Sequence, residues 1–118
     1  MSFKEDNLIQ HKTFEFALSI IKFYTHCKSQ NEYILSKQIL RSGTSIGANV
    51  EEAIAAQSKK DFISKLSIAN KEARETKYWL KLYQSSNLVK VEVDSYLKEI
   101  ESIINILTKI IKTSSENL

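Results

Sequence analysis

The chain has 118 residues, of which 42% are apolar and 26% are charged, and its 17 basic and 14 acidic residues leave a net charge of +3. This balance is typical of one soluble globular domain and excludes a disordered chain. Proline is absent and glycine occurs only twice, which argues against an all-β fold and against enzymes that hold phosphate in glycine-rich loops. Composition therefore predicts an all-α protein.

Apolar residues recur with alternating steps of four and three, the pattern of helices packed side by side. We expect four helices, which span residues 8–28, 32–57, 59–85 and 91–112. A polar tail covers 113–118. The connections are short, so residues 1–118 are expected to form a single domain, an antiparallel up-down-up-down four-helix bundle. Two pairs have the spacing of a helix N-terminal cap, Ser29 with Glu32 and Ser58 with Asp61.

The first segment carries large apolar residues on two faces. Phe14, Ala17, Ile21 and Tyr24 keep the four-three rhythm and are the predicted core stripe. At about 100° per residue, a second set falls on the opposite side of that helix: Phe16, Ile20, Phe23 and Cys27. In the last segment the apolar arc is widened by Ile103, Ile106 and Ile110.

A monomeric bundle would leave these additional apolar side chains in water, so we expect the chain to assemble with copies of itself. The residues predicted at the contact between subunits are Phe16, Ile20, Phe23, Ile106 and Ile110. A broad core with scattered exposed apolar residues is the alternative interpretation.

Residues that could carry catalysis are few. His11 and His26 lie four turns apart on one predicted helix and cannot share a metal, and adjacent His26 and Cys27 project about 100° apart. No metalloprotease, di-iron or serine-hydrolase motif is present. We therefore expect no enzyme, no cofactor or metal and no small-molecule substrate. The first ten residues lack the apolar core of a signal peptide, no segment is apolar enough to span a membrane, and a cytoplasmic location is expected.

The segment 41–49 holds both glycines of the chain. Gly43 and Gly47 are four residues apart and share one helix face, where each costs about 1 kcal/mol relative to alanine. Close approach of another helix backbone or a kink would explain them, and a phosphate-binding loop is the weaker alternative. Asn49 lies on the predicted core stripe, where an interior amide most often fixes helix register or oligomeric state.

Positive charge is concentrated in the third segment, which has seven basic and three acidic residues over 58–86. Most of the bases project into one arc of the helix. A solvated helix face would explain this arc, and phosphate binding is the functional alternative. For phosphate binding the candidate residues are Lys60, Lys71, Arg74, Lys77, Tyr78 and Lys81, hereafter the basic stripe.

Three motifs, at 41–53, 60–66 and 71–80, together resemble the signature of the four-helix bundle proteins encoded in 23S rRNA intervening sequences. The likeness extends over essentially the whole chain. The positions that carry it and are expected to be structural are Arg41, Gly43, Gly47, Asn49, Glu52, Glu72, Glu75 and Trp79.

The resemblance implies a function without catalytic residues. This family is similar to the accessory variability protein of diversity-generating retroelements, a basic bundle that forms a homopentamer and binds nucleic acid. The leading hypothesis is a non-enzymatic, homo-oligomeric bundle, with five copies favoured, that binds ribosomal RNA or other structured nucleic acid. The alternative is a scaffold or adaptor that binds a protein partner and has no nucleic-acid role.

Overall fold

The computed structural model describes the backbone of residues 3–117 and the side chains of residues 8–117. This part of the chain is all-α, without a strand, as the composition predicts. Its four helices are α1 (Phe3–Ser29), α2 (Leu35–Ile54), α3 (Lys59–Ser86) and α4 (Asp94–Glu116). No helix in this range is at once long and apolar enough to cross a membrane.

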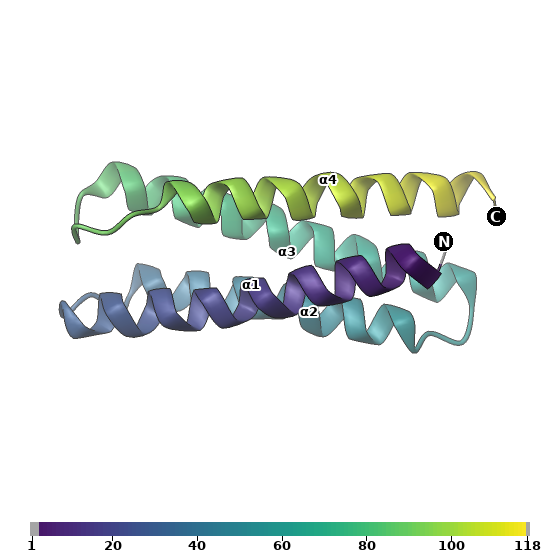
Figure 1. Ribbon diagram of the computed structural model, residues 1–118, viewed down its shortest axis with the longest axis horizontal. Helices are drawn as coiled ribbons and strands as arrows, with labels where there is room; N and C mark the ends of the chain where they lie inside the picture. The colour runs from purple at the N-terminus through teal and green to yellow at the C-terminus, as the bar shows by residue number, and fades with distance from the viewer. Residues whose placement is uncertain (1–2, 118) are drawn as a thin grey trace.

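The four helices lie side by side along one long axis in a body of 47 × 21 × 20 Å (Figure 1). The α1–α2 and α3–α4 connections lie at one end, and the α2–α3 connection lies at the other (Figure 1). α2 packs against both α1 and α3, whereas α4 packs mainly on α3 and touches α1 much less. The α2–α3 pair is therefore the best-packed part of the fold.

Several helix ends differ from the predicted ones. α1 begins at Phe3 rather than at residue 8, and α2 begins at Leu35 rather than at residue 32. The predicted end of the last helix at residue 112 is wrong, because α4 continues through the polar residues 113–116 and ends at Glu116. In this added turn Ser114 lies on the inner face of α4 and is only 1% exposed. The last residue of the predicted tail, 118, lies outside the described residues.

One of the two predicted N-terminal caps is confirmed. Ser58 precedes α3, and its hydroxyl accepts a hydrogen bond from the Asp61 amide at 3.1 Å. Ser29 does not cap α2, because it ends α1. Instead, the Glu32 carboxylate accepts from the amides of Ile34 at 2.9 Å and Leu35 at 2.8 Å, so a carboxylate takes the capping role.

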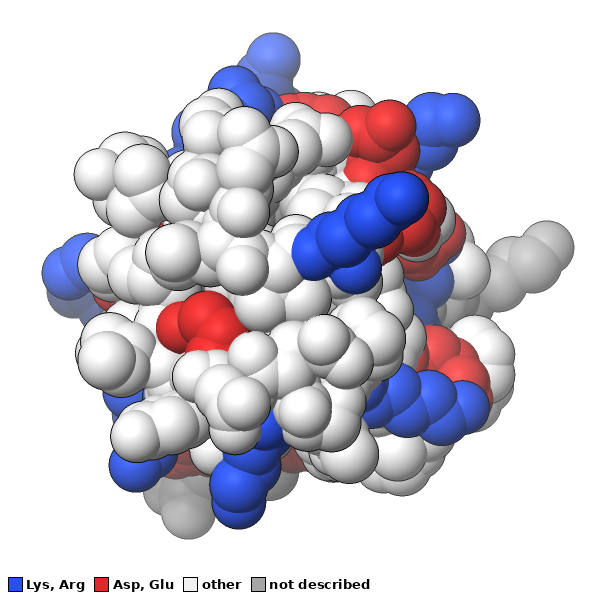
Figure 2. All heavy atoms as spheres, turned by 90° about the vertical axis from the view of Figure 1, so that its left-hand side faces the viewer, with Lys and Arg blue, Asp and Glu red and all other residues white. Residues whose placement is uncertain are grey.

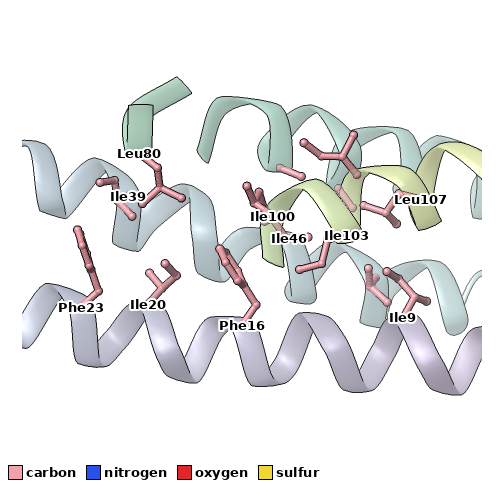
Figure 3. Close-up of a cluster of buried hydrophobic side chains, with 14 of the residues drawn as sticks. Ile9, Phe16, Ile20, Phe23, Ile39, Ile46, Leu80, Ile100, Ile103 and Leu107 are labelled. Atoms are coloured by element: carbon pink, nitrogen blue, oxygen red, sulfur yellow. The ribbon is translucent and has the colours of Figure 1, made fainter. Parts of the chain in front are cut away.

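The predicted inner face of α1 is wrong. Phe16, Ile20 and Phe23 are 3% exposed or less, and they point toward the helices opposite α1 (Figure 3). Phe14 and Ile21, assigned to the core from their spacing, are 60% and 46% exposed. The inner face instead runs along a longer four-three stripe that contains no charged residue: Ile9, Thr13, Phe16, Ile20, Phe23 and Cys27.

This rotation of α1 also corrects the predicted contact between subunits. Phe16, Ile20 and Phe23 are buried within a single chain, so they have no surface left for a second copy. Ile110 is 3% exposed and belongs to the same core, and Ile106 is half-buried against it. The wide apolar arc of α4 therefore fits the alternative interpretation, in which these residues belong to a broad core within one chain.

Both glycines lie where α2 approaches α1. A Cβ atom at Gly43 would lie 3.1 Å from Cγ2 of Ile20, and one at Gly47 would lie 3.4 Å from the backbone oxygen of Thr13. Both distances fit the close approach expected from the sequence. The two sites differ in what a methyl group would displace, since Ile20 is fully buried and the Gly47 contact is an ordinary van der Waals distance.

We predict opposite results for alanine at the two glycines. Gly47→Ala should raise the free energy of unfolding by up to about 1 kcal/mol, because alanine is the better helix former. Gly43→Ala gains the same propensity but must displace Ile20 in a packed core, which costs about 1–3 kcal/mol. Urea denaturation of the two variants measures the difference. Equal stabilisation of the two variants would show that Ile20 can move away from a methyl group at position 43 at little cost.

The Glu32 cap predicts a pH dependence. Burial raises the pKa of this carboxyl, but the hydrogen bonds from Leu35 and Ser36 outweigh burial and leave the pKa below its usual 4.5. The charged cap therefore stabilises the fold above that pH, and the contribution is lost as the pH falls below it. Glu32→Gln should cost about 0.5–1 kcal/mol at pH 7 and much less at pH 3, measured by urea denaturation at both values. A loss independent of pH would contradict a charged cap.

Candidate nucleic-acid interface

The basic stripe follows the outer side of α3. The side chains of Lys60, Lys71, Arg74 and Lys81 are exposed to solvent. Tyr78 is 59% exposed, and its ring meets that of Trp79 edge-on, with 5.3 Å between the ring centroids. Five of the six stripe residues are thus accessible to a ligand, and the tyrosine ring is held in place by its neighbour.

Lys77 is the exception within the basic stripe. It is half-buried, and its ammonium group pairs with the Glu101 carboxylate of α4. The hydrogen bond from Lys77 lowers the pKa of Glu101, and the charges of Lys81 and Arg74 lower it further. Glu101 therefore remains ionised at neutral pH and offsets part of the positive charge that the sequence assigns to this face.

A groove of about 770 Å³ lies between α3 and α4, beside the basic stripe. Three lysines line it, Lys77, Lys81 and Lys98, together with the carboxylates of Asp94 and Glu101. Lys98 belongs to α4. The positive surface, which the sequence assigned to α3 alone, therefore extends onto a second helix. The sequence could not reveal this addition, because it depends on how α4 is rotated against α3.

The family-motif residues on α3 face the other way, toward α2. Arg41 of α2 pairs with Glu75, and its second nitrogen lies 3.8 Å from the Glu72 carboxylate. The indole nitrogen of Trp79 donates to the same Glu75 carboxylate at 3.2 Å. One carboxylate therefore joins an arginine on α2 to a tryptophan on α3, and the cluster holds the two helices together.

Two further polar contacts join α2 and α3. Glu52 lies 3.8 Å from Lys65, and the buried hydroxyl of Thr76 donates to Ser42 at 2.8 Å. Asn49 makes no such contact between helices, because its amide donates to the Ser45 carbonyl of its own helix at 2.9 Å. In the described part of the chain, the buried polar link is thus the Ser42–Thr76 pair.

The two histidines and the cysteine belong to α1 and do not line the groove between α3 and α4. His11 and His26 are exposed, whereas Cys27 is buried, and burial raises the pKa of its thiol. Among residues 8–117, no three histidine, cysteine, aspartate or glutamate side chains come together as metal ligands would. The charged surface of α3 and α4 is therefore the strongest candidate site in the described structure.

Comparison with known proteins identifies the family. The profile of the 23S rRNA-intervening sequence protein family matches residues 5–109. The chain belongs to this family. The solved structure of a protein of unknown function from the S23 ribosomal protein family of Bacteroides thetaiotaomicron is 47% identical, with a TM-score of 0.87. The alignment covers 92% of this chain and 98% of that one. No curated protein matches the chain.

The Lys77–Glu101 pair predicts how the chain responds to a polyanion. Glu101→Gln removes the carboxylate that neutralises Lys77, so the variant should elute from heparin at higher salt than the wild type. Glu99→Gln is the matched control, since it removes the same charge two residues away, where Glu99 lies 3.8 Å from Lys12 of α1. Equal shifts for both variants would mean that net charge alone governs binding.

Proposed function

We propose that the chain forms an antiparallel four-helix bundle that assembles with copies of itself and binds RNA or other structured nucleic acid. Binding uses the basic stripe of α3 and involves no catalytic step. The observation that carries the proposal is the exposure of four basic side chains and Tyr78 along one side of a single helix. Family membership supports it, because the family takes its name from sequences within ribosomal RNA genes.

The chemistry of the basic stripe fits phosphate contacts better than base recognition. Lysine and arginine neutralise phosphates and release counterions, which gives affinity without sequence preference. Tyr78 offers an exposed ring on which a base can stack. Binding should therefore be tolerant of sequence, should prefer nucleic acid with accessible bases, and should weaken steeply with salt.

Self-association is supported by a different part of the molecule. Phe14, Leu18 and Ile21 lie on the outer side of α1 and are 60%, 42% and 46% exposed. Their steps of four and three form a continuous apolar row, which a monomer would leave in water. A further copy of the basic stripe in each subunit would strengthen binding to a long ligand. Five copies remains the number that the family resemblance favours.

The proposal predicts which lysines matter. A variant with four stripe residues neutralised should bind a structured RNA about ten-fold more weakly or worse in a gel shift, because phosphate contacts are lost. The salt slope should fall by about 1 for each lost contact. This variant carries Lys60→Gln, Lys71→Gln, Arg74→Gln and Lys81→Gln.

A control variant removes the same charge from exposed positions outside α3, and it should keep most of the affinity. It carries Lys37→Gln, Lys90→Gln, Lys109→Gln and Lys112→Gln. Equal losses in the two variants would place the contacts elsewhere, and the absence of any shift at low salt would contradict nucleic-acid binding altogether.

An adaptor role is the second candidate, and one surface favours it. The end of the bundle that carries the α1–α2 and α3–α4 connections is largely uncharged in its middle apart from an acidic group, and both basic and acidic side chains surround it (Figure 2). Tyr33, Ile34 and Leu88 lie in these connections and are 56%, 72% and 58% exposed. Binding to a protein through this end would survive neutralisation of the basic stripe.

A further inference from the structure

Three side-chain contacts align α3 with α4 along the groove between them. Successive contacts lie seven residues apart on both helices: Gln84–Asp94 at 2.7 Å, Lys77–Glu101, and Asn70–Thr108 at 3.3 Å. Lys81 lies between the first two contacts on α3, and Leu97 and Lys98 lie between them on α4. Lys81 and Lys98 therefore line opposite walls of the groove at the same level.

These two lysines are the cations of the groove that remain free for a ligand. Both are exposed, and neither forms an ion pair with any of the described side chains. The two carboxylates of the groove have partners, since Glu101 pairs with Lys77 and Asp94 accepts a hydrogen bond from a glutamine of α3. A phosphate placed between Lys81 and Lys98 would therefore meet two ammonium groups at once.

Beyond Lys98, the α4 wall changes from charged to apolar. Glu101 lies about 4.5 Å further along the helix axis and Ile106 about 12 Å further, from the rise of an α-helix. The ion pair of Glu101 uses only one oxygen of its carboxylate, Oε1. Ile106 is half-buried against the core and lines the groove, with Ser102 and Asn105 beside it. The wall thus offers a cation, a hydrogen-bond acceptor and an apolar surface in that order.

We infer that the groove binds one unpaired ribonucleotide, with its phosphate between Lys81 and Lys98. The 2′-hydroxyl of the ribose donates to the free oxygen of Glu101, and the base rests on Ile106. The inference rests on the nucleic-acid binding proposed above and names the form of nucleic acid that this site takes. The volume of about 770 Å³ lies within the range of cavities that hold one small ligand.

The apolar part of the groove separates unpaired from paired nucleic acid. A duplex can bring its phosphates to the exposed lysines, but its base faces are stacked inside the helix and do not reach a groove between two packed α-helices. An unpaired nucleotide uses the lysines and the apolar surface together. The hydroxyl of Ser102 and the amide of Asn105 are then available to the edge of the base.

Two isoleucines of α4 provide a variant and its matched control. Ile106→Ala removes the surface on which the base rests, whereas Ile111→Ala shortens a half-buried isoleucine that does not line the groove. In fluorescence anisotropy, Ile106→Ala should bind a short oligouridylate about five-fold more weakly or worse, which is the loss of one base contact. Its affinity for an RNA duplex with the same number of phosphates should not change.

The control Ile111→Ala should bind both ligands as the wild type does, and circular dichroism should show both variants folded. Tyr78 is present in both variants, so its exposed ring cannot account for a difference between them. A second measurement needs no variant. Millimolar uridine monophosphate should shift the methyl resonances of Ile106 in an NMR titration, and inorganic phosphate at the same concentration should leave them in place.

The outcomes separate the two proposals. Equal affinity of Ile106→Ala and Ile111→Ala for the oligouridylate, or no methyl shift with the nucleotide, would overturn the inference and leave the proposed function standing. An oligodeoxyuridylate that binds the wild type as tightly as the oligouridylate would overturn the contact between Glu101 and the ribose. Failure of every RNA to bind at low salt would instead contradict the proposed function.

Discussion

The contact between Ile20 and Gly43 fixes the rotation of α1 about its own axis. Because position 43 has no side chain, the fully buried Ile20 packs directly against the α2 backbone, and the rest of its stripe follows into the core. That rotation leaves Phe14, Leu18 and Ile21 outside. One close approach between two helices therefore decides both what holds the bundle together and which apolar side chains of α1 remain exposed.

The α2–α3 pair gives this arrangement its rigid frame. The buried Ser42–Thr76 hydrogen bond and the Arg41–Glu75–Trp79 cluster join the two helices on adjoining sides. The same frame divides the surface of α3, since the carboxylates are used on the side of α2 while most basic residues remain toward solvent and α4. The residues that hold α3 against α2 and the residues proposed to bind nucleic acid therefore lie on different sides of the same helix.

The sequence predicted α3 well, since the predicted span 59–85 agrees with Lys59–Ser86 and the buried residues of this helix repeat in steps of three and four. The sequence prediction failed at α1, where two faces carry large apolar residues. Periodicity alone does not tell which of these two faces is buried. The longer uncharged stripe from Ile9 to Cys27 was the available signal. The Lys77–Glu101 pair had no such signal, because it depends on the packing of α4 against α3.

Two neighbouring residues of the same type test the rotation of α1 most directly. Ile20 is fully buried and Ile21 is 46% exposed. In urea denaturation at a chain concentration low enough to prevent assembly, Ile20→Ala should lower the free energy of unfolding by about 2–5 kcal/mol. Ile21→Ala should change it by less than about 0.5 kcal/mol. Equal losses, or a larger loss at Ile21, would contradict this account of the fold and of the surface that it exposes.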